Sequence, residues 1–242
     1  MGRAQRRGRL IAIAMRRALL EDSFVIRSFF AHWKCRPPCF GLLLAALFAS
    51  GATIADEFTC GPLTSTFGPF DYRTAKPFDI KIVEDFHFTR EVETLKSGKS
   101  SYIGEDLHYT LTVFPNHYRA LAAMMNLQFK TKTDKPLGAK STVPCYFDRA
   151  IRFTPDDATV RTLFGVYLMR LGKTTDAVQE FETAERLGDD SGNLHYNIGL
   201  AYFEVREYEK SLAHAKRAYE LGFNLPGLKE KLAKAGKWPG VQ

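Results

Sequence analysis

The chain after residue 55 lacks an excess of charge of either sign. The 242 residues carry 34 Lys and Arg against 27 Asp and Glu, a formal net charge of +7. Nine of the basic residues and two of the acidic ones lie in residues 1–55, so residues 56–242 hold 25 of each sign. A surface that follows a phosphate backbone needs a local basic excess. Nucleic-acid binding is therefore not expected of this region.

Long apolar runs are also lacking. The most apolar run, Phe40–Ala49, has ten residues, whereas a helix needs roughly 20 to cross a bilayer. Basic residues precede the uncharged stretch 39–55, which ends at the small residue Ala55. This combination is typical of a secretory signal peptide cleaved after Ala55, and an uncleaved membrane anchor over residues 40–55 is the alternative. We therefore expect an exported protein, periplasmic or extracellular, whose leader (1–55) has an over-long start.

Cysteine is scarce, with four in the whole chain. Cys35 and Cys39 belong to the leader, so only Cys60 and Cys145 remain after cleavage. Two cysteines in an exported chain suggest one disulfide between them, and two free thiols are the alternative. Metal binding by these two alone is not favoured, because structural zinc sites use four ligands.

Signatures of catalysis are missing as well. The chain has no G-x-S-x-G, no H-E-x-x-H and no acidic calcium loop. Residues 97–100 end like a phosphate-binding loop, but Glu93 stands where its first glycine is required. The histidines form no i, i+4 pair, and His195 is expected to be a core or interface ring. The sequence predicts no enzyme, no cofactor and no metal site.

What the chain does have is an internal period of 34 residues. Gly165 and Gly199 are separated by that distance, and their surroundings match. In units that start at Ala158 and Gly192, small residues stand at positions 8, 20 and 27 and larger ones predominate at positions 7, 11 and 24. Small residues let two antiparallel helices approach closely, and large residues fill the space between them.

This pattern resembles the tetratricopeptide repeat family. The resemblance implies an all-α fold, a right-handed α-solenoid of about three helical hairpins with a preceding half-repeat. Repeats are expected over 118–157, 158–191 and 192–225, the first with 40 residues. Position 4, where the family favours Trp, is occupied by Leu121, Arg161 and His195.

Four regions follow from these patterns. They are the leader (1–55), an irregular N-terminal arm with short helices (56–100), the repeat array (101–225) and a C-terminal capping helix (226–242). Stacked helical hairpins bury their apolar faces only against neighbours, which is why a terminal cap with a polar outer side is expected.

The resemblance also implies a concave groove lined by the first helix of each hairpin. Its apolar floor carries amide, guanidinium and phenol groups, which suits an extended peptide or a partner helix. The expected groove residues are Arg119, Asn126, Phe129, Thr162, Leu163, Val166, Met169, Arg170, Asn193, Tyr196, Asn197, Leu200 and Phe203. The alternative is that Leu200 and Phe203 only contact the capping helix.

The sequence thus predicts an exported, non-catalytic adaptor that binds an envelope protein or peptide in this groove. It would meet a membrane only through an uncleaved leader. Two alternatives stay open. One is a membrane-anchored assembly factor. The other is a metal-dependent enzyme or small-ligand site between the 60–117 arm and the first repeats, formed by His87, His108, His117 and Glu105.

Overall fold

Every regular element in the described residues is an α-helix. The computed structural model describes residues 60–99 and 101–240, which contain ten helices and no strand. The helices are α2 (Pro77–His87), α3 (Arg90–Glu93), α4 (Ile103–Val113), α5 (Tyr118–Thr131), α6 (Val143–Phe153), α7 (Ala158–Arg170), α8 (Thr174–Arg186), α9 (Gly192–Glu204), α10 (Tyr208–Glu220) and α11 (Gly227–Lys234). None of these helices is both long and apolar enough to cross a bilayer. The expected leader, residues 1–55, lies outside the described residues.

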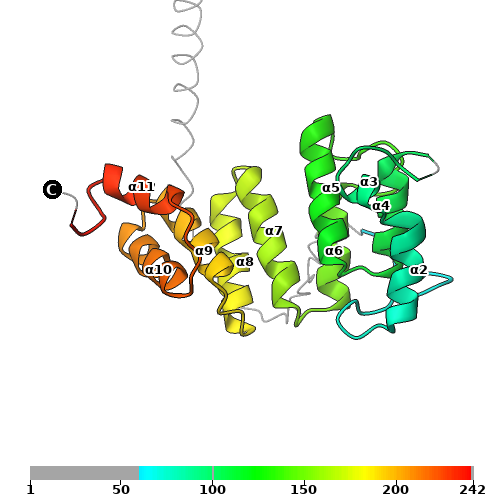
Figure 1. The fold of residues 1–242 in the computed structure, drawn as a ribbon, viewed down its shortest axis with the longest axis horizontal. Helices are drawn as coiled ribbons and strands as arrows, with labels where there is room; N and C mark the ends of the chain where they lie inside the picture. Colours follow the sequence, from blue (N-terminus) through cyan, green and yellow to red (C-terminus); the bar gives the residue numbers. More distant parts are fainter. Residues whose placement is uncertain (1–59, 100, 241–242) are drawn as a thin grey trace, which may run out of the picture. The chain divides into compact units, whose positions relative to one another are not determined.

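Consecutive helices form hairpins that stack on one another. Helix α5 contacts α6, α7 contacts α8, and α9 contacts α10. The first helices of successive hairpins also touch, α5 with α7 and α7 with α9, and the hairpins follow one another in chain order (Figure 1). The described residues therefore form the expected all-α solenoid of tetratricopeptide-like hairpins.

The first helix of each hairpin begins with a side-chain cap. The side chains of His117, Asp157 and Ser191 accept hydrogen bonds from backbone N–H groups of the first turns of α5, α7 and α9. Such caps satisfy amide donors that have no partner inside the helix. The three capping residues stand at the same place in each repeat, so the period of the sequence also sets where the helices start.

Two glycines explain how closely the helices approach. A Cβ added to Gly165 in α7 would overlap the ring of Phe181 in α8. A Cβ added to Gly199 in α9 would lie 2.5 Å from Cδ2 of Leu228 in α11. The glycine at position 8 therefore lets α7 and α8 approach closely in the 158–191 repeat. In the 192–225 repeat it lets α9 and α11 approach closely.

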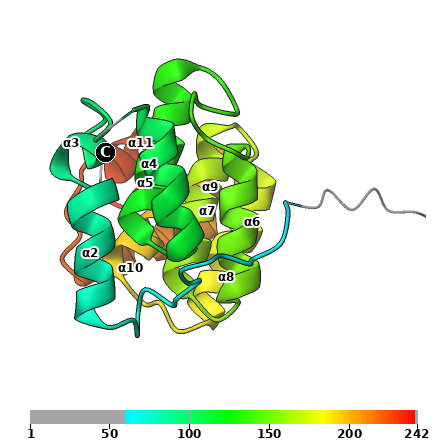
Figure 2. The ribbon, with the colours of Figure 1, turned by 90° about the vertical axis from the view of Figure 1, so that its right-hand side faces the viewer.

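The N-terminal arm covers the start of the stack. Residues 60–76 contain no helix, and then α2 contacts α4 while α3 contacts both α4 and α5 (Figure 2). The expected disulfide is present: Cys60 is bonded to Cys145 of α6, with their Cα atoms 4.9 Å apart. Arg152 Nη2 also donates to the carbonyl oxygen of Gly61 at 3.0 Å. These contacts attach the arm to the first hairpin.

Candidate functional site

Helix α2 carries large apolar residues on two sides. Val83 is 2% exposed and lies in a small core with Phe114. On the other side Phe78, Ile82 and Phe86 follow one another at intervals of four residues and are 73%, 40% and 58% exposed. A surface helix normally presents polar residues outward. The residues Phe78, Ile82 and Phe86, here named the α2 face, therefore form an apolar surface with no cover in the described residues.

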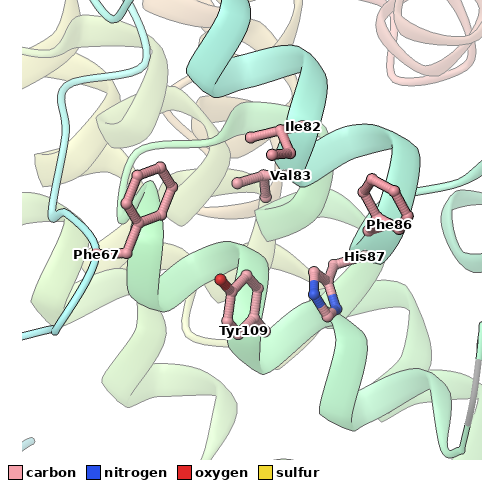
Figure 3. A pocket seen from close by; sticks show the side chains of 6 residues that line it. All are labelled: Phe67, Ile82, Val83, Phe86, His87 and Tyr109. Atoms are coloured by element: carbon pink, nitrogen blue, oxygen red, sulfur yellow. The ribbon is translucent and has the colours of Figure 1, made fainter.

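A pocket of about 290 Å³ opens beside the α2 face (Figure 3). It is lined by Phe67, Ile82, Val83, Phe86, His87 and Tyr109. The irregular segment before α2, α2 itself and α4 each contribute to this lining. Sites for drug-sized molecules commonly have volumes of about 300–1,000 Å³. The pocket lies just below that range, which suits one large apolar side chain.

The two polar residues that line the pocket, His87 and Tyr109, contact each other, and His87 also contacts Asp106. His87 Nδ1 lies 3.2 Å from Oδ1 of Asp106, and the His87 ring lies on the ring of Tyr109 with centroids 3.9 Å apart. Asp106 is 4% exposed and also accepts the backbone N–H of Lys99 at 2.7 Å. The six described lining residues include no serine, cysteine or carboxylate. The other four lining residues, Phe67, Ile82, Val83 and Phe86, are apolar, so the lining is mostly apolar.

A second polar group attaches α2 to the start of α5. Glu84 Oε1 accepts hydrogen bonds from the Tyr72 hydroxyl at 3.0 Å and from His117 Nε2 at 3.1 Å. His117 Nδ1 accepts the backbone N–H of Ala120, so the proton of the neutral ring lies on Nε2. Burial lowers the pKa of His117 to about 4. The ring is therefore neutral at pH 7 and acts as a helix cap and a donor to Glu84.

The four side chains of the proposed enzyme site do not meet in the described residues. His87 and His117 bond the two carboxylates named above, whereas His108 Nδ1 lies 2.9 Å from the hydroxyl of Tyr146. Burial lowers the pKa of His108. Glu105 is exposed. The three histidines thus have three different partners, and the described residues hold no potential metal-binding cluster made of these four side chains.

At the α5 end, the expected groove is flanked by α3. Arg119 Nη2 lies 2.7 Å from Glu93 Oε2, and the Arg119 guanidinium lies over the ring of Phe88 at 5.1 Å. Lys130 Nζ donates to the carbonyl oxygen of Leu95 at 2.6 Å. Arg119, the basic residue expected to meet a partner here, is thus already paired within the chain.

At the α9 end, the groove is covered by α11. Tyr196 is 8% exposed, and its hydroxyl accepts the backbone N–H of Leu228 at 3.2 Å. Leu200 and Phe203 are partly buried against the cluster that contains Leu228 and Leu232. Leu200 and Phe203 thus contact the capping helix, and both stay partly exposed. Tyr196 is not accessible to a partner while α11 is in place.

In the middle of the stack some groove residues remain accessible. Arg170 Nη1 donates to Asn126 Oδ1 at 2.6 Å, and the Arg170 guanidinium lies over the Phe129 ring at 3.8 Å. Asn193 and Asn197 are hydrogen-bonded to each other at 3.2 Å. These five residues of the expected groove are exposed or partly exposed, and they are here named the central groove.

The remaining expected groove residues lie deeper. Thr162 is 5% exposed and donates to the carbonyl oxygen of Ala158 at 3.0 Å, so it differs from the expectation of a groove contact. Leu163, Val166 and Met169 are partly buried against the two cores that meet at α7.

The sequence interpretation overlooked the α2 face. The sequence predicts an irregular arm with short helices over residues 56–100, but it assigns no function to Phe78, Ile82 or Phe86. A signal was present, because the three residues have the four-residue spacing of one helix side and follow Pro77, which is favoured in the first turn of a helix. The pattern indicates an apolar side, but it does not say whether that side is covered.

Similarity to known proteins is confined to solved structures. No protein-family model matches the chain, and no curated protein matches it. Among solved structures, MamA labelled AMB-1 is 24% identical over 49% of this chain and 66% of that chain, with a TM-score of 0.37. MamA labelled MSR-1 is 20% identical over 63% of this chain and 80% of that chain, with a TM-score of 0.41. The chain thus spans slightly less than two thirds of the first of these proteins. Similarities of this strength do not assign it to a family.

Proposed function

We propose that this protein is an exported, non-catalytic adaptor that binds an apolar helix of a partner protein on the α2 face. The observation that carries the proposal is the exposure of Phe78, Ile82 and Phe86 beside a pocket of about 290 Å³. Fully burying such a side chain contributes about 1.5–3 kcal/mol. Burial of these three side chains against a partner would therefore contribute several kilocalories per mole to the free energy of binding.

The form of the surface favours a helix as its occupant. The three side chains lie along one side of α2, so a partner helix lying beside it could place its own i, i+4 residues between them. One large side chain of that helix would enter the pocket as an anchor.

Export is part of the proposal and rests on two features. The leader has the pattern of a signal peptide, and the Cys60–Cys145 disulfide belongs to the kind of bond that persists outside the cytosol. The partner is then a protein of the cell envelope. Intact mass of the purified protein tests this: a chain that begins at residue 56 with one disulfide supports export with cleavage. A retained leader supports the membrane-anchored alternative.

The central groove is a second surface for the same function. Asn126, Arg170, Asn193 and Asn197 offer amide and guanidinium groups. Such groups suit the backbone of an extended peptide. This surface could bind a second partner or a further segment of the first.

Binding to the partner purified from envelope extract distinguishes the two surfaces. The α2-face variant combines Phe78→Ser and Phe86→Ser, and the groove variant combines Asn126→Ala and Arg170→Ala. The matched control combines Leu137→Ser and Leu225→Ser, which are 66% and 52% exposed outside both surfaces. Affinity is measured by calorimetry with the isolated partner.

We expect the α2-face variant to lose at least tenfold in affinity, while the groove variant and the control stay within threefold of wild type. If only the groove variant lost affinity, the binding site would be the central groove and not the α2 face. Equal affinity in all four proteins would refute both surfaces. Circular dichroism of each variant verifies that the helices are intact.

A further inference from the structure

Two histidines face each other in the last hairpin at positions where the preceding hairpin has an ion pair. His195 of α9 and His214 of α10 lie 34 residues after Arg161 of α7 and Glu180 of α8. Arg161 Nη1 lies 3.0 Å from Glu180 Oε2. Two imidazoles cannot form such an ion pair, and they repel each other when both are protonated. Two neutral rings share one hydrogen bond instead, in which a single proton lies between two nitrogen lone pairs that could equally face a metal ion.

The two rings and a nearby carboxylate point toward one place. The Nδ1 atoms of His195 and His214 are 2.9 Å apart, and Glu185 Oε1 of α8 lies 3.8 Å from His195 Nδ1. One ligand atom from each of the three residues lies within 4.8 Å of the others. In a tetrahedral zinc site, bonds of about 2.0–2.2 Å separate the ligand atoms by roughly 3.3–3.5 Å. Small side-chain rotations would bring these three atoms to that spacing.

A second layer of contacts orients His195. Its Nε2 lies 2.7 Å from Asp190 Oδ1, and Arg217 Nε lies 3.3 Å from the same oxygen. A proton on Nε2 that is donated to Asp190 leaves the lone pair of Nδ1 directed toward His214 and Glu185. Metal-bound histidines characteristically donate their other N–H to a carboxylate in this way. His195 is also 5% exposed, so its ring is held in place.

We propose that Glu185, His195 and His214 bind a divalent transition-metal ion of the zinc class, with Asp190 as the positioning residue for His195. Imidazole and carboxylate ligands together favour such ions over magnesium and calcium, which prefer oxygen ligands alone. The Glu185 side chain is 42% exposed, which leaves a route for the ion and space for water as a fourth ligand. The bound ion joins α8 of one hairpin to α9 and α10 of the next. This site is independent of the α2 face.

Zinc titration of the full chain tests the site. The protein carries no affinity tag with histidines, and Cys35→Ser and Cys39→Ser remove the leader thiols as competing ligands. Calorimetry with ZnCl2 is expected to give one saturable site. The absorption spectrum with Co2+ is expected to show nitrogen and oxygen coordination. Glu185→Gln should weaken zinc binding at least tenfold, and Asp190→Asn should weaken it about 10–100-fold.

Two further variants separate metal binding from a structural role. The double change His195→Arg with His214→Glu introduces the ion pair of the preceding hairpin, so it should keep the fold and abolish zinc binding. Glu209→Gln alters an exposed glutamate outside the cluster and should bind zinc as wild type does. The proposal is overturned if wild type shows no saturable site. It is also overturned if Glu185→Gln or the double variant retains wild-type affinity.

Discussion

The hydroxyl of Tyr196 accepts a hydrogen bond from the backbone N–H of Leu228 at 3.2 Å, which joins the last hairpin to α11. One turn along α9, Gly199 leaves the space that Leu228 occupies. Leu228 and Leu232 are fully buried there. Helix α11 thus covers the apolar surface on which a further hairpin would otherwise stack.

Substitution of Tyr196 should detach α11 in a graded way. Tyr196→Phe removes only the hydrogen bond, so we expect the free energy of unfolding to fall by about 1 kcal/mol. Tyr196→Ala also removes a buried ring and should cost about 3–5 kcal/mol. Urea denaturation measures both changes, and hydrogen exchange of the amides in Gly227–Lys234 reports the detachment. Tyr102→Phe, at a side chain 54% exposed, serves as the control. Equal stability of Tyr196→Ala and wild type would contradict the role of this contact.

Gly165→Ala should destabilise the protein although alanine is the better helix former. The added methyl group would overlap the ring of Phe181, which is fully buried. Forcing extra atoms into such a place costs about 1–3 kcal/mol, more than the gain of about 1 kcal/mol in helix propensity. Thermal denaturation gives the sign of the change. A raised melting temperature would show that α7 and α8 can separate without cost.

Reduction of the Cys60–Cys145 disulfide should destabilise the arm and the first hairpin. The bond closes a loop across a sequence separation of 85 residues, which contributes about 4 kcal/mol in the chain-entropy model. We expect a lower melting temperature with reductant and faster hydrogen exchange in α2 and α6. A variant with Cys60→Ser and Cys145→Ser should not respond to reductant. An unchanged melting temperature of the reduced wild type would refute this contribution.

Acid should destabilise the protein through His117. Burial lowers the pKa of His117 to about 4 in the folded state, whereas an unperturbed histidine has a pKa of about 6.5. Between these values the unfolded chain binds more protons, so the free energy of unfolding falls as the pH decreases from about 6.5 to about 4. The loss is roughly 2–4 kcal/mol at about 1.4 kcal/mol per pH unit, and it does not grow further below pH 4.

The variant His117→Asn isolates this contribution. Asparagine can still accept the N–H of Ala120 as a helix cap, but it does not titrate. Urea denaturation between pH 4 and pH 7 should therefore show a shallower pH dependence for the variant than for wild type. The groups that face the ring, Glu84 and Arg119, are unchanged in both proteins. Identical slopes would show that His117 does not control acid stability.

Much of the fold could be predicted because its determinants are local or periodic. Small residues such as Gly165 and Ala177 recur every 34 residues, and that period alone indicates helical hairpins that approach closely. The pairing of Cys60 with Cys145 was also predictable, since the signal-peptide pattern leaves only these two cysteines. Asn126 and Arg170 were both expected in the groove, but the hydrogen bond between them was not predictable from the sequence.

The features on which both proposals rest depend on contacts between distant segments. The apolar spacing of Phe78, Ile82 and Phe86 is visible in the chain, yet their exposure depends on which helices cover α2.

Likewise, a search for i, i+4 histidines could not pair His195 with His214, because these residues meet across two helices. The sequence by itself determined the all-α repeat, since helix propensity and small-residue spacing act within or between adjacent helices. Only the tertiary structure decided which faces stay open and which side chains meet, because burial depends on every element that packs nearby.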